Sequence, residues 1–143
     1  MPDDPRLEDF PIQTADKVRY ADTDRQGHVN NALFATFLET GRVEILYNPD
    51  LPLANVYGEF VIARLELDFR AELHWPGQIT IGTRVASIGR SSIKLSQCLF
   101  QDGVCAALAD TAIVHIDRQT RRARALSTEA VERLNGWITR APD

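Results

Sequence analysis

The sequence predicts an α+β domain in which one long helix lies against a single antiparallel sheet. Three observations support this prediction: a long segment with apolar residues at helical spacing, four later segments of alternating polar and apolar residues, and short polar turns between those segments. The chain has 143 residues, the size of one compact domain. We therefore expect a single domain over 1–143, with its core at about 15–126 and a short C-terminal helix at about 127–138.

The first half of the chain predicts a short strand and a buried helix. Residues 17–21 form a strand candidate, and a polar segment with one glycine follows over 22–29. Residues 30–47 carry apolar side chains at three- and four-residue spacing, which is typical of a helix packed on a sheet. Asn30 or Asn31 is expected to cap the start of this helix, because an asparagine side chain can accept a hydrogen bond from a free backbone N–H.

The second half predicts four strands in a meander. Over 61–69, apolar residues occupy the odd positions and charged residues most of the even ones, which indicates a half-buried strand with one apolar face. The other strands are expected at 78–88, 93–100 and 104–116. The dipeptide Asp102-Gly103 favours a two-residue type I′ turn, since both residues can adopt a positive φ.

Composition and charge restrict the partners and the compartment. Sixteen basic and twenty acidic side chains give a net charge of −4, so we expect no nucleic-acid partner, because phosphate backbones attract basic surfaces. The sequence has no apolar run of about 18 residues and no basic-then-apolar leader, which predicts a cytoplasmic protein without a membrane partner. The two cysteines, Cys98 and Cys105, are expected to be packed thiols rather than a disulfide.

One segment, 19–31, has a composition that packing does not explain. It places two carboxylates (Asp22 and Asp24), the imidazole of His28 and Gly27 directly before the predicted helix. The first turn of a helix has unpaired backbone N–H groups and the positive end of the dipole, which stabilise negative charge on a carbonyl oxygen. A carboxylate beside it can activate water or attack a carbonyl. The alternative interpretation is that both aspartates only cap turns.

The same segment carries a family resemblance. It reads Tyr20-x-Asp22-x-Asp24-x-x-Gly27-His28-Val29-Asn30-Asn31, and the helix continues with Phe37-Leu38-Glu39 and Arg42. Later residues that fit are Arg64-x-Glu66-x-Asp68-Phe69, Pro76-Gly77, Gly89-Arg90-Ser91-Ser92 and Asp117-Arg118-x-Thr120. Over about 15–126 the chain resembles the hot-dog-fold acyl-CoA thioesterases of the 4-hydroxybenzoyl-CoA thioesterase type, in particular the long-chain acyl-CoA thioesterase branch. That fold is a long central helix wrapped by a five-stranded antiparallel sheet.

The resemblance implies a hydrolase that cleaves acyl-CoA thioesters to a free acid and coenzyme A. By position in the motif, Asp24 would be the catalytic carboxylate, and the amide of Asn31 would help to hold the thioester oxygen. His28 lies beside Asp24 in the motif, and both a direct role and a structural role remain open for it. Tyr20 and Gly27 belong to the same motif and are assigned to substrate binding.

Two further assignments also have alternatives. Glu39 is the reserve candidate for the carboxylate, because another branch of the family uses a helix glutamate; the alternative is an ion pair with a base such as Arg42 or an arginine of a partner subunit. Family position assigns Arg90, Ser91 and Ser92 to the coenzyme A phosphates, for which a guanidinium group is well shaped. The alternative for this turn is a solvated charged face.

The resemblance also implies a homodimer with active sites at its interface, and often a tetramer. Dimerisation would cover the edge of a sheet built from such long strands. Two other functions fit the sequence: a non-catalytic module that binds acyl-CoA or acyl-carrier thioesters, and an enoyl-CoA hydratase that uses Asp24 and His28. No nucleotide-binding or zinc-binding motif is present, so we expect no metal and no cofactor other than the coenzyme A carried by the substrate.

Overall fold

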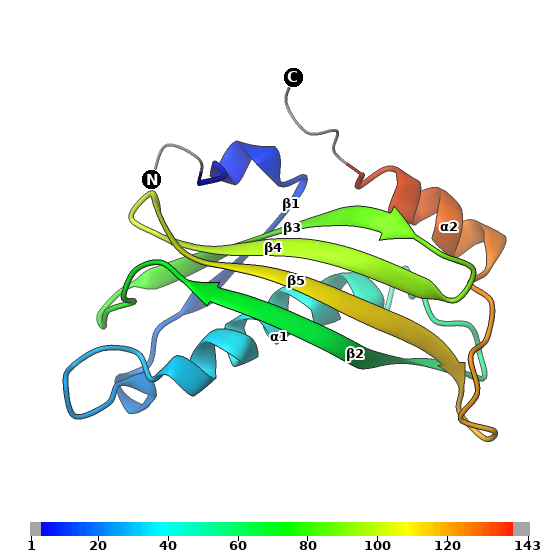
Figure 1. Cartoon of the computed structure of the whole chain (residues 1–143), viewed down its shortest axis with the longest axis horizontal. Coiled ribbons are helices and arrows are strands. Elements are labelled where there is room, and N and C mark those ends of the chain that lie inside the picture. The colour runs from blue at the N-terminus through cyan, green and yellow to red at the C-terminus, as the bar shows by residue number, and fades with distance from the viewer. Residues whose placement is uncertain (1–3, 139–143) are drawn as a thin grey trace.

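The computed structural model describes residues 4–138, which form one antiparallel sheet with a long helix on one face (Figure 1). The elements are β1 (Ile12–Lys17), α1 (Asn31–Leu46), β2 (Gly58–Phe69), β3 (Gln78–Ile88), β4 (Ser92–Gln101), β5 (Val104–Asp117) and α2 (Thr128–Asn135), with 3₁₀ turns at Leu7–Asp9 and Tyr20–Asp22. This arrangement confirms the α+β class and the central helix on a five-stranded sheet. The ends of the expected domain, 1–3 and 139–143, lie outside the described residues.

The central helix α1 begins and ends close to where the sequence predicts. Asn30 is the N-cap, and its side-chain oxygen accepts a hydrogen bond from the backbone N–H of Ala32 at 3.0 Å. The buried face of α1 packs mainly against β1, β3 and β4. Gly41 allows the close approach of helix and sheet, because a Cβ at this position would lie 2.6 Å from Cγ2 of Ile81.

The sheet order corrects the predicted meander in one strand. The order is β1-β3-β4-β5-β2, so β3, β4 and β5 form the expected meander, but β2 pairs with β5 at the far edge instead of with β3. Residues 70–77 therefore cross from one side of the sheet to the other rather than closing a hairpin. Eight extended residues can span about 26 Å, more than the roughly 14 Å between strands three places apart.

The first strand lies earlier than predicted. The expected strand at 17–21 shares only Lys17 with β1 (Ile12–Lys17), and Tyr20–Asp22 form a 3₁₀ turn instead. In that turn the carboxylate of Asp22 accepts a hydrogen bond from the backbone N–H of Arg19 at 2.7 Å. The pattern missed β1 because this edge strand buries only Thr14 and so carries little apolar signal.

A β-bulge at Ala63 overturns the prediction that all odd residues of β2 share one face. Ala63 has no partner in β5, so the pairing passes from Ile62 directly to Arg64. An extra residue reverses the alternation of side chains between the two faces. Before the bulge the even residue Phe60 contacts the ring of Tyr47 at 5.9 Å, and after it the odd residue Phe69 contacts Phe34 on α1 at 5.0 Å.

The side chains of β2 are also more exposed than those of the half-buried strand that the sequence predicts. The apolar side chains of Ile62, Leu65 and Phe69 are 52%, 36% and 52% exposed. The reason is the sheet order: β2 lies at the edge beyond β5, whereas α1 covers mainly the strands at the other side of the sheet. The apolar residues of β2 are therefore available to a neighbour outside the chain.

The β4–β5 hairpin and its two cysteines match the predictions. Asp102 and Gly103 have φ values of 51° and 78°, as a type I′ turn requires. Cys98 and Cys105 are free and buried. Burial raises the pKa of both thiols, which keeps them protonated and poorly reactive at neutral pH.

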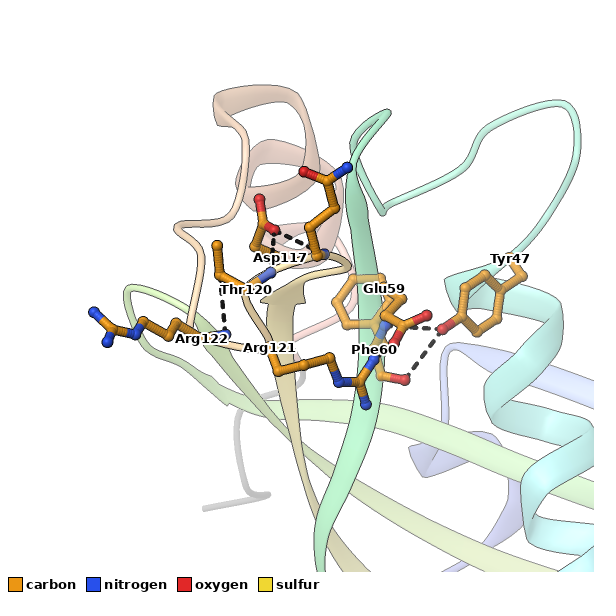
Figure 2. A network of polar contacts seen from close by, with 8 residues as sticks. Tyr47, Glu59, Phe60, Asp117, Thr120, Arg121 and Arg122 are labelled. Atoms are coloured by element: carbon orange, nitrogen blue, oxygen red, sulfur yellow. Dashed lines mark hydrogen bonds and ion pairs between the residues drawn. The ribbon is translucent and has the colours of Figure 1, made fainter.

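A loop rich in arginine follows β5 and makes a network of polar contacts (Figure 2). Oδ1 of Asp117 accepts hydrogen bonds from the backbone N–H groups of Gln119 and Thr120, each at 2.9 Å, and Oδ2 accepts one from Arg124 at 2.9 Å. Arg121 forms an ion pair with Glu59 at the start of β2. These contacts join the loop to the end of β5 and to the start of the edge strand β2.

Replacing Asp117 with asparagine should lower Tm slightly at neutral pH. The backbone hydrogen bonds, together with the Arg124 guanidinium, hold the pKa of the Asp117 carboxyl below its usual value. A lowered pKa in the folded state stabilises the protein above the unfolded-state value of about 3.9, and this stability is lost as the pH falls through the folded-state pKa. Thermal melts from pH 7 to pH 3 test this. The Tm difference between wild type and Asp117→Asn should shrink with acid, and a constant difference would contradict the argument.

Candidate active site

A pocket of about 290 Å³ lies where α1 begins and β2 ends. Its lining residues are Asp24, Gln26, His28, Val29, Asn31, Phe34, Phe69, Arg70, Ala71 and Glu72. The structure thus brings together Asp24, His28 and Asn31, the three residues expected to be catalytic. Two larger hollows, of about 710 and 600 Å³, are lined partly by Pro5 and contain none of the residues assigned above.

The loop before α1 holds Asp24 in a fixed place at this pocket. Thr23 and Val29 form a β-bridge, and the backbone N–H of Asp24 donates to the carbonyl of His28 at 2.8 Å. The turn closes when the N–H of Gly27 donates to the carbonyl of Asp24 at 3.0 Å. Gly27 has a φ of 85°, a conformation that glycine adopts without strain. Gly27 therefore shapes the loop and does not itself line the pocket.

The two oxygens of the Asp24 carboxylate have different surroundings. Oδ1 accepts hydrogen bonds from the backbone N–H groups of Gln26 at 2.9 Å and His28 at 3.3 Å. Oδ2 has no hydrogen-bond partner within the described part of the chain. Asp24 therefore caps a turn with one oxygen and has the other available for chemistry. The purely turn-capping interpretation holds for Asp22, whose carboxylate binds the Arg19 N–H and does not line the pocket.

The first turn of α1 lies at the same pocket as this carboxylate. The N–H of Ala32 binds the Asn30 side chain, and the N–H of Leu33 binds the Asn30 carbonyl at 2.9 Å. The N–H of Asn31 has no partner among residues 4–138, and Asn31 lines the pocket. A free N–H at the positive end of a helix dipole is suited to bind an oxygen that gains negative charge.

Sequence reasoning missed two residues that surround His28. Nε2 of His28 lies 3.2 Å from Oε2 of Glu72, and Nε2 of His74 lies 3.8 Å from the same oxygen. The two imidazole rings are nearly perpendicular, with centroids 5.6 Å apart, and the two residues form a β-bridge. Glu72 and His74 belong to the crossing segment 70–77. No spacing rule connects this segment to His28, because its path depends on the sheet order.

Tyr20 and Glu39 lie outside this pocket. The Tyr20 side chain is 72% exposed, and its ring contacts Trp75 at 5.1 Å. Glu39 is eight residues after Asn31, about 12 Å along the helix, where it lines a separate cleft of about 210 Å³ with Arg42. The expected Glu39–Arg42 ion pair does not form within 4 Å. Arg42 instead donates to Gln97 at 3.4 Å, and burial lowers the pKa of its guanidinium.

Arg90, Ser91 and Ser92 lie at the β3–β4 turn, at the other end of the sheet from this pocket (Figure 1). The carbonyls of Arg90 and Ser91 accept hydrogen bonds from the N–H groups of Leu126 and His115, at 2.9 and 2.7 Å. A strand as long as β3 separates the turn from the segment 70–77, about 35 Å for 11 residues. Within one chain, these three residues do not share a site with Asp24.

Neither a metal-binding cluster nor a membrane-spanning helix is found among the described residues. No group of three or more histidine, cysteine, aspartate or glutamate side chains between residues 4 and 138 is arranged to hold a metal ion. Over the same residues, neither helix combines the length and the hydropathy needed to cross a lipid bilayer.

Comparison with known proteins identifies the family. Residues 18–134 match the model of the thioesterase-like superfamily. The chain belongs to this superfamily. This confirms the thioesterase resemblance and the hot-dog fold that it implies. As a member of the thioesterase-like superfamily, the chain is 32% identical over 133 residues to the long-chain acyl-CoA thioesterase FadM of Escherichia coli, covering 89% of this chain and 99% of that protein.

Two solved structures show how well the superfamily fold is matched. The PA5185 protein of Pseudomonas aeruginosa is 26% identical, with a TM-score of 0.87 over 96% of this chain and 99% of the other. A Thermus thermophilus thioesterase, solved with coenzyme A and zinc, is 27% identical, with a TM-score of 0.75 over 87% of this chain and 98% of the other. The chain therefore spans nearly the whole length of these thioesterase-like relatives.

Proposed function

We propose that this chain hydrolyses acyl-CoA thioesters to a free acid and coenzyme A. One observation carries the proposal: Asp24 and Asn31 line the same pocket at the start of α1, and neither Oδ2 of Asp24 nor the N–H of Asn31 has a hydrogen-bond partner among residues 4–138. The first group can attack or activate water, and the second can hold the thioester oxygen. Membership of the thioesterase superfamily and the similarity to an acyl-CoA thioesterase support acyl-CoA as the substrate class.

The proposed reaction needs a carboxylate and an oxyanion donor. In the tetrahedral intermediate, the negative charge on the former carbonyl oxygen is stabilised by the Asn31 N–H and the helix dipole. Oδ2 of Asp24 forms its new bond either to the acyl carbon or to a proton of the attacking water. The sulfur leaves as a thiolate without a strong acid, because thiols have a pKa of about 8.5. The route is proposed to be independent of metal, so treatment with a chelator should leave turnover unchanged.

We also propose that the working unit is a homodimer or a tetramer built from it. The exposed apolar residues of β2, among them Ile62 and Phe69, would be covered by a second copy. Arg90, Ser91 and Ser92 are too far from Asp24 to serve the same substrate in one chain. They are proposed to bind the coenzyme A phosphates at a neighbouring subunit's site.

A panel of acyl-CoA substrates tests this function directly. We expect release of free thiol, measured with a thiol-reactive dye, from at least one acyl-CoA of the panel. Tight binding of coenzyme A esters without thiol release would instead favour the non-catalytic binding module. Loss of the conjugated double bond of a 2-enoyl-CoA, with the thioester intact, would favour the hydratase.

A further inference from the structure

The pairing of His28 with Glu72 has no part in the function proposed above. Nε2 of His28 lies 3.2 Å from Oε2 of the Glu72 carboxylate, and both residues line the Asp24 pocket. A carboxylate only accepts hydrogen bonds, so the proton of a neutral His28 ring belongs on Nε2. Nδ1 then keeps its lone pair, and it has no partner among residues 4–138. The pairing therefore selects one tautomer, in which Nδ1 is a proton acceptor.

We propose that Glu72 is a positioning residue that holds His28 in this tautomer, so that Nδ1 takes the proton of the water that completes thioester hydrolysis. The inference rests on the proposed function and assigns Asp24 the role of nucleophile. In this mechanism Asp24 attacks the acyl carbon, and His28 accepts the proton of the attacking water. One oxygen of Asp24 is bound to two backbone N–H groups, which leaves a single oriented oxygen for the attack.

The thioester is cleaved in two displacement steps at the acyl carbon. Oδ2 of Asp24 bonds to the acyl carbon, and the carbon–sulfur bond breaks with its electron pair on the departing thiolate. Water then attacks the acyl carbon of the resulting anhydride while one water proton moves to Nδ1 of His28. The bond from the acyl carbon to Asp24 breaks and restores the carboxylate. The imidazolium finally gives its proton to the thiolate, so one water yields an acid and a thiol.

The charges around His28 favour a transient imidazolium. Within its own segment it lies near the carboxylate of Asp24, and the crossing segment contributes Glu72, His74 and Arg70. The residues of α1 and β2 that line the pocket are uncharged. Arg70 is paired with Asp4 at 3.3 Å, which offsets its charge. Glu72 is therefore the carboxylate placed to stabilise the protonated ring of His28.

The first test is the kinetics of two variants. In His28→Ala, thiol release should show a burst of one thiol per active site and then a turnover about 10²- to 10⁴-fold slower than wild type, because the anhydride loses its base. In Glu72→Gln, kcat should fall about tenfold with KM unchanged, because the ring loses the carboxylate that orients it.

Glu66→Gln is the matched control for Glu72→Gln. The Glu66 side chain is 58% exposed, as is that of Glu72, and it is also paired with a base, Arg64. It lies in β2, outside the pocket. Its kcat and KM should equal those of wild type. If Glu66→Gln and Glu72→Gln behave alike, or if His28→Ala shows neither a burst nor a slower turnover, the proposal is overturned.

A second measurement does not depend on turnover. Nitrogen-15 NMR of the histidine rings in the wild-type protein should show neutral His28 with its proton on Nε2, and Glu72→Gln should weaken that preference. A proton on Nδ1 would contradict the positioning role, even in an active enzyme. If no acyl-CoA is hydrolysed but the Nε2 tautomer is observed, the proposed function fails while the pairing stands, so the two failures are distinguishable.

Discussion

Replacing Asp24 with asparagine should lower kcat for acyl-CoA hydrolysis by about 10³-fold or more, the size expected when a reacting carboxylate is lost. The substitution keeps the shape of the side chain. The asparagine oxygen can still accept the hydrogen bonds that Oδ1 receives from the N–H groups of Gln26 and His28. The free oxygen, however, becomes an uncharged amide that neither attacks carbon nor accepts a proton. The measurement is thiol release over the acyl-CoA panel.

Asp22→Asn is the control for this variant. Asp22 lies two residues away and also accepts a backbone hydrogen bond, but it does not line the pocket. Its turnover should stay close to that of wild type, and both variants should give wild-type circular dichroism. Full activity of Asp24→Asn would refute the assignment. Glu39, the reserve candidate on α1, would then be the next residue to replace.

Replacing Gly58 with alanine should destabilise the protein by about 3 kcal/mol, the upper part of the range for overpacking a core. A Cβ at this position would lie 2.1 Å from Nε2 of His115 and 2.7 Å from Oδ1 of Asn55. The His115 ring is fully buried, bound through Nδ1 to the Arg124 carbonyl at 3.0 Å and packed on Phe60. It therefore has little room to move. Thermal unfolding should show a Tm lower by about 10 °C.

Gly103→Ala is the control for Gly58→Ala, because it introduces backbone strain without steric overlap. Gly103 has a positive φ of 78°, but a Cβ there would meet no atom within 4 Å. It should cost only the strain of a left-handed alanine, about 1 kcal/mol. A Gly58→Ala variant as stable as Gly103→Ala would show that the His115 site can relax.

The sequence predicted the elements whose signals are local. The helix spacing and the asparagine cap located α1 to within one residue, and the Asp102-Gly103 dipeptide specified the hairpin turn. The motif at the start of α1 placed Asp24, His28 and Asn31 together, because a loop of seven residues gives its ends few ways to separate. The residues alone did not decide whether the aspartates cap turns or take part in catalysis. The family resemblance supplied the predicted roles.

The parts that sequence reasoning missed depend on contacts between distant segments. The alternation in β2 shows that a strand exists, but the choice between β3 and β5 as its neighbour is made by the sheet as a whole. Glu72 and His74 reach His28 only because residues 70–77 cross the sheet. The same limit applies to Arg90, whose distance from Asp24 follows from the length and direction of β3.

The bulge in β2 makes one position of this strand tolerant of change. Many small or polar residues could replace Ala63, since it is exposed and has no cross-strand partner. Deleting Ala63 would also keep every pair of the ladder, because Ile62 already pairs with Ile113 and Arg64 pairs with the next residue, Ala112. A deletion within a paired stretch of β2, in contrast, would shift one half of the strand by one residue relative to β5. Homologous chains should therefore vary freely at Ala63, and even lose it, while the paired residues on either side keep their number.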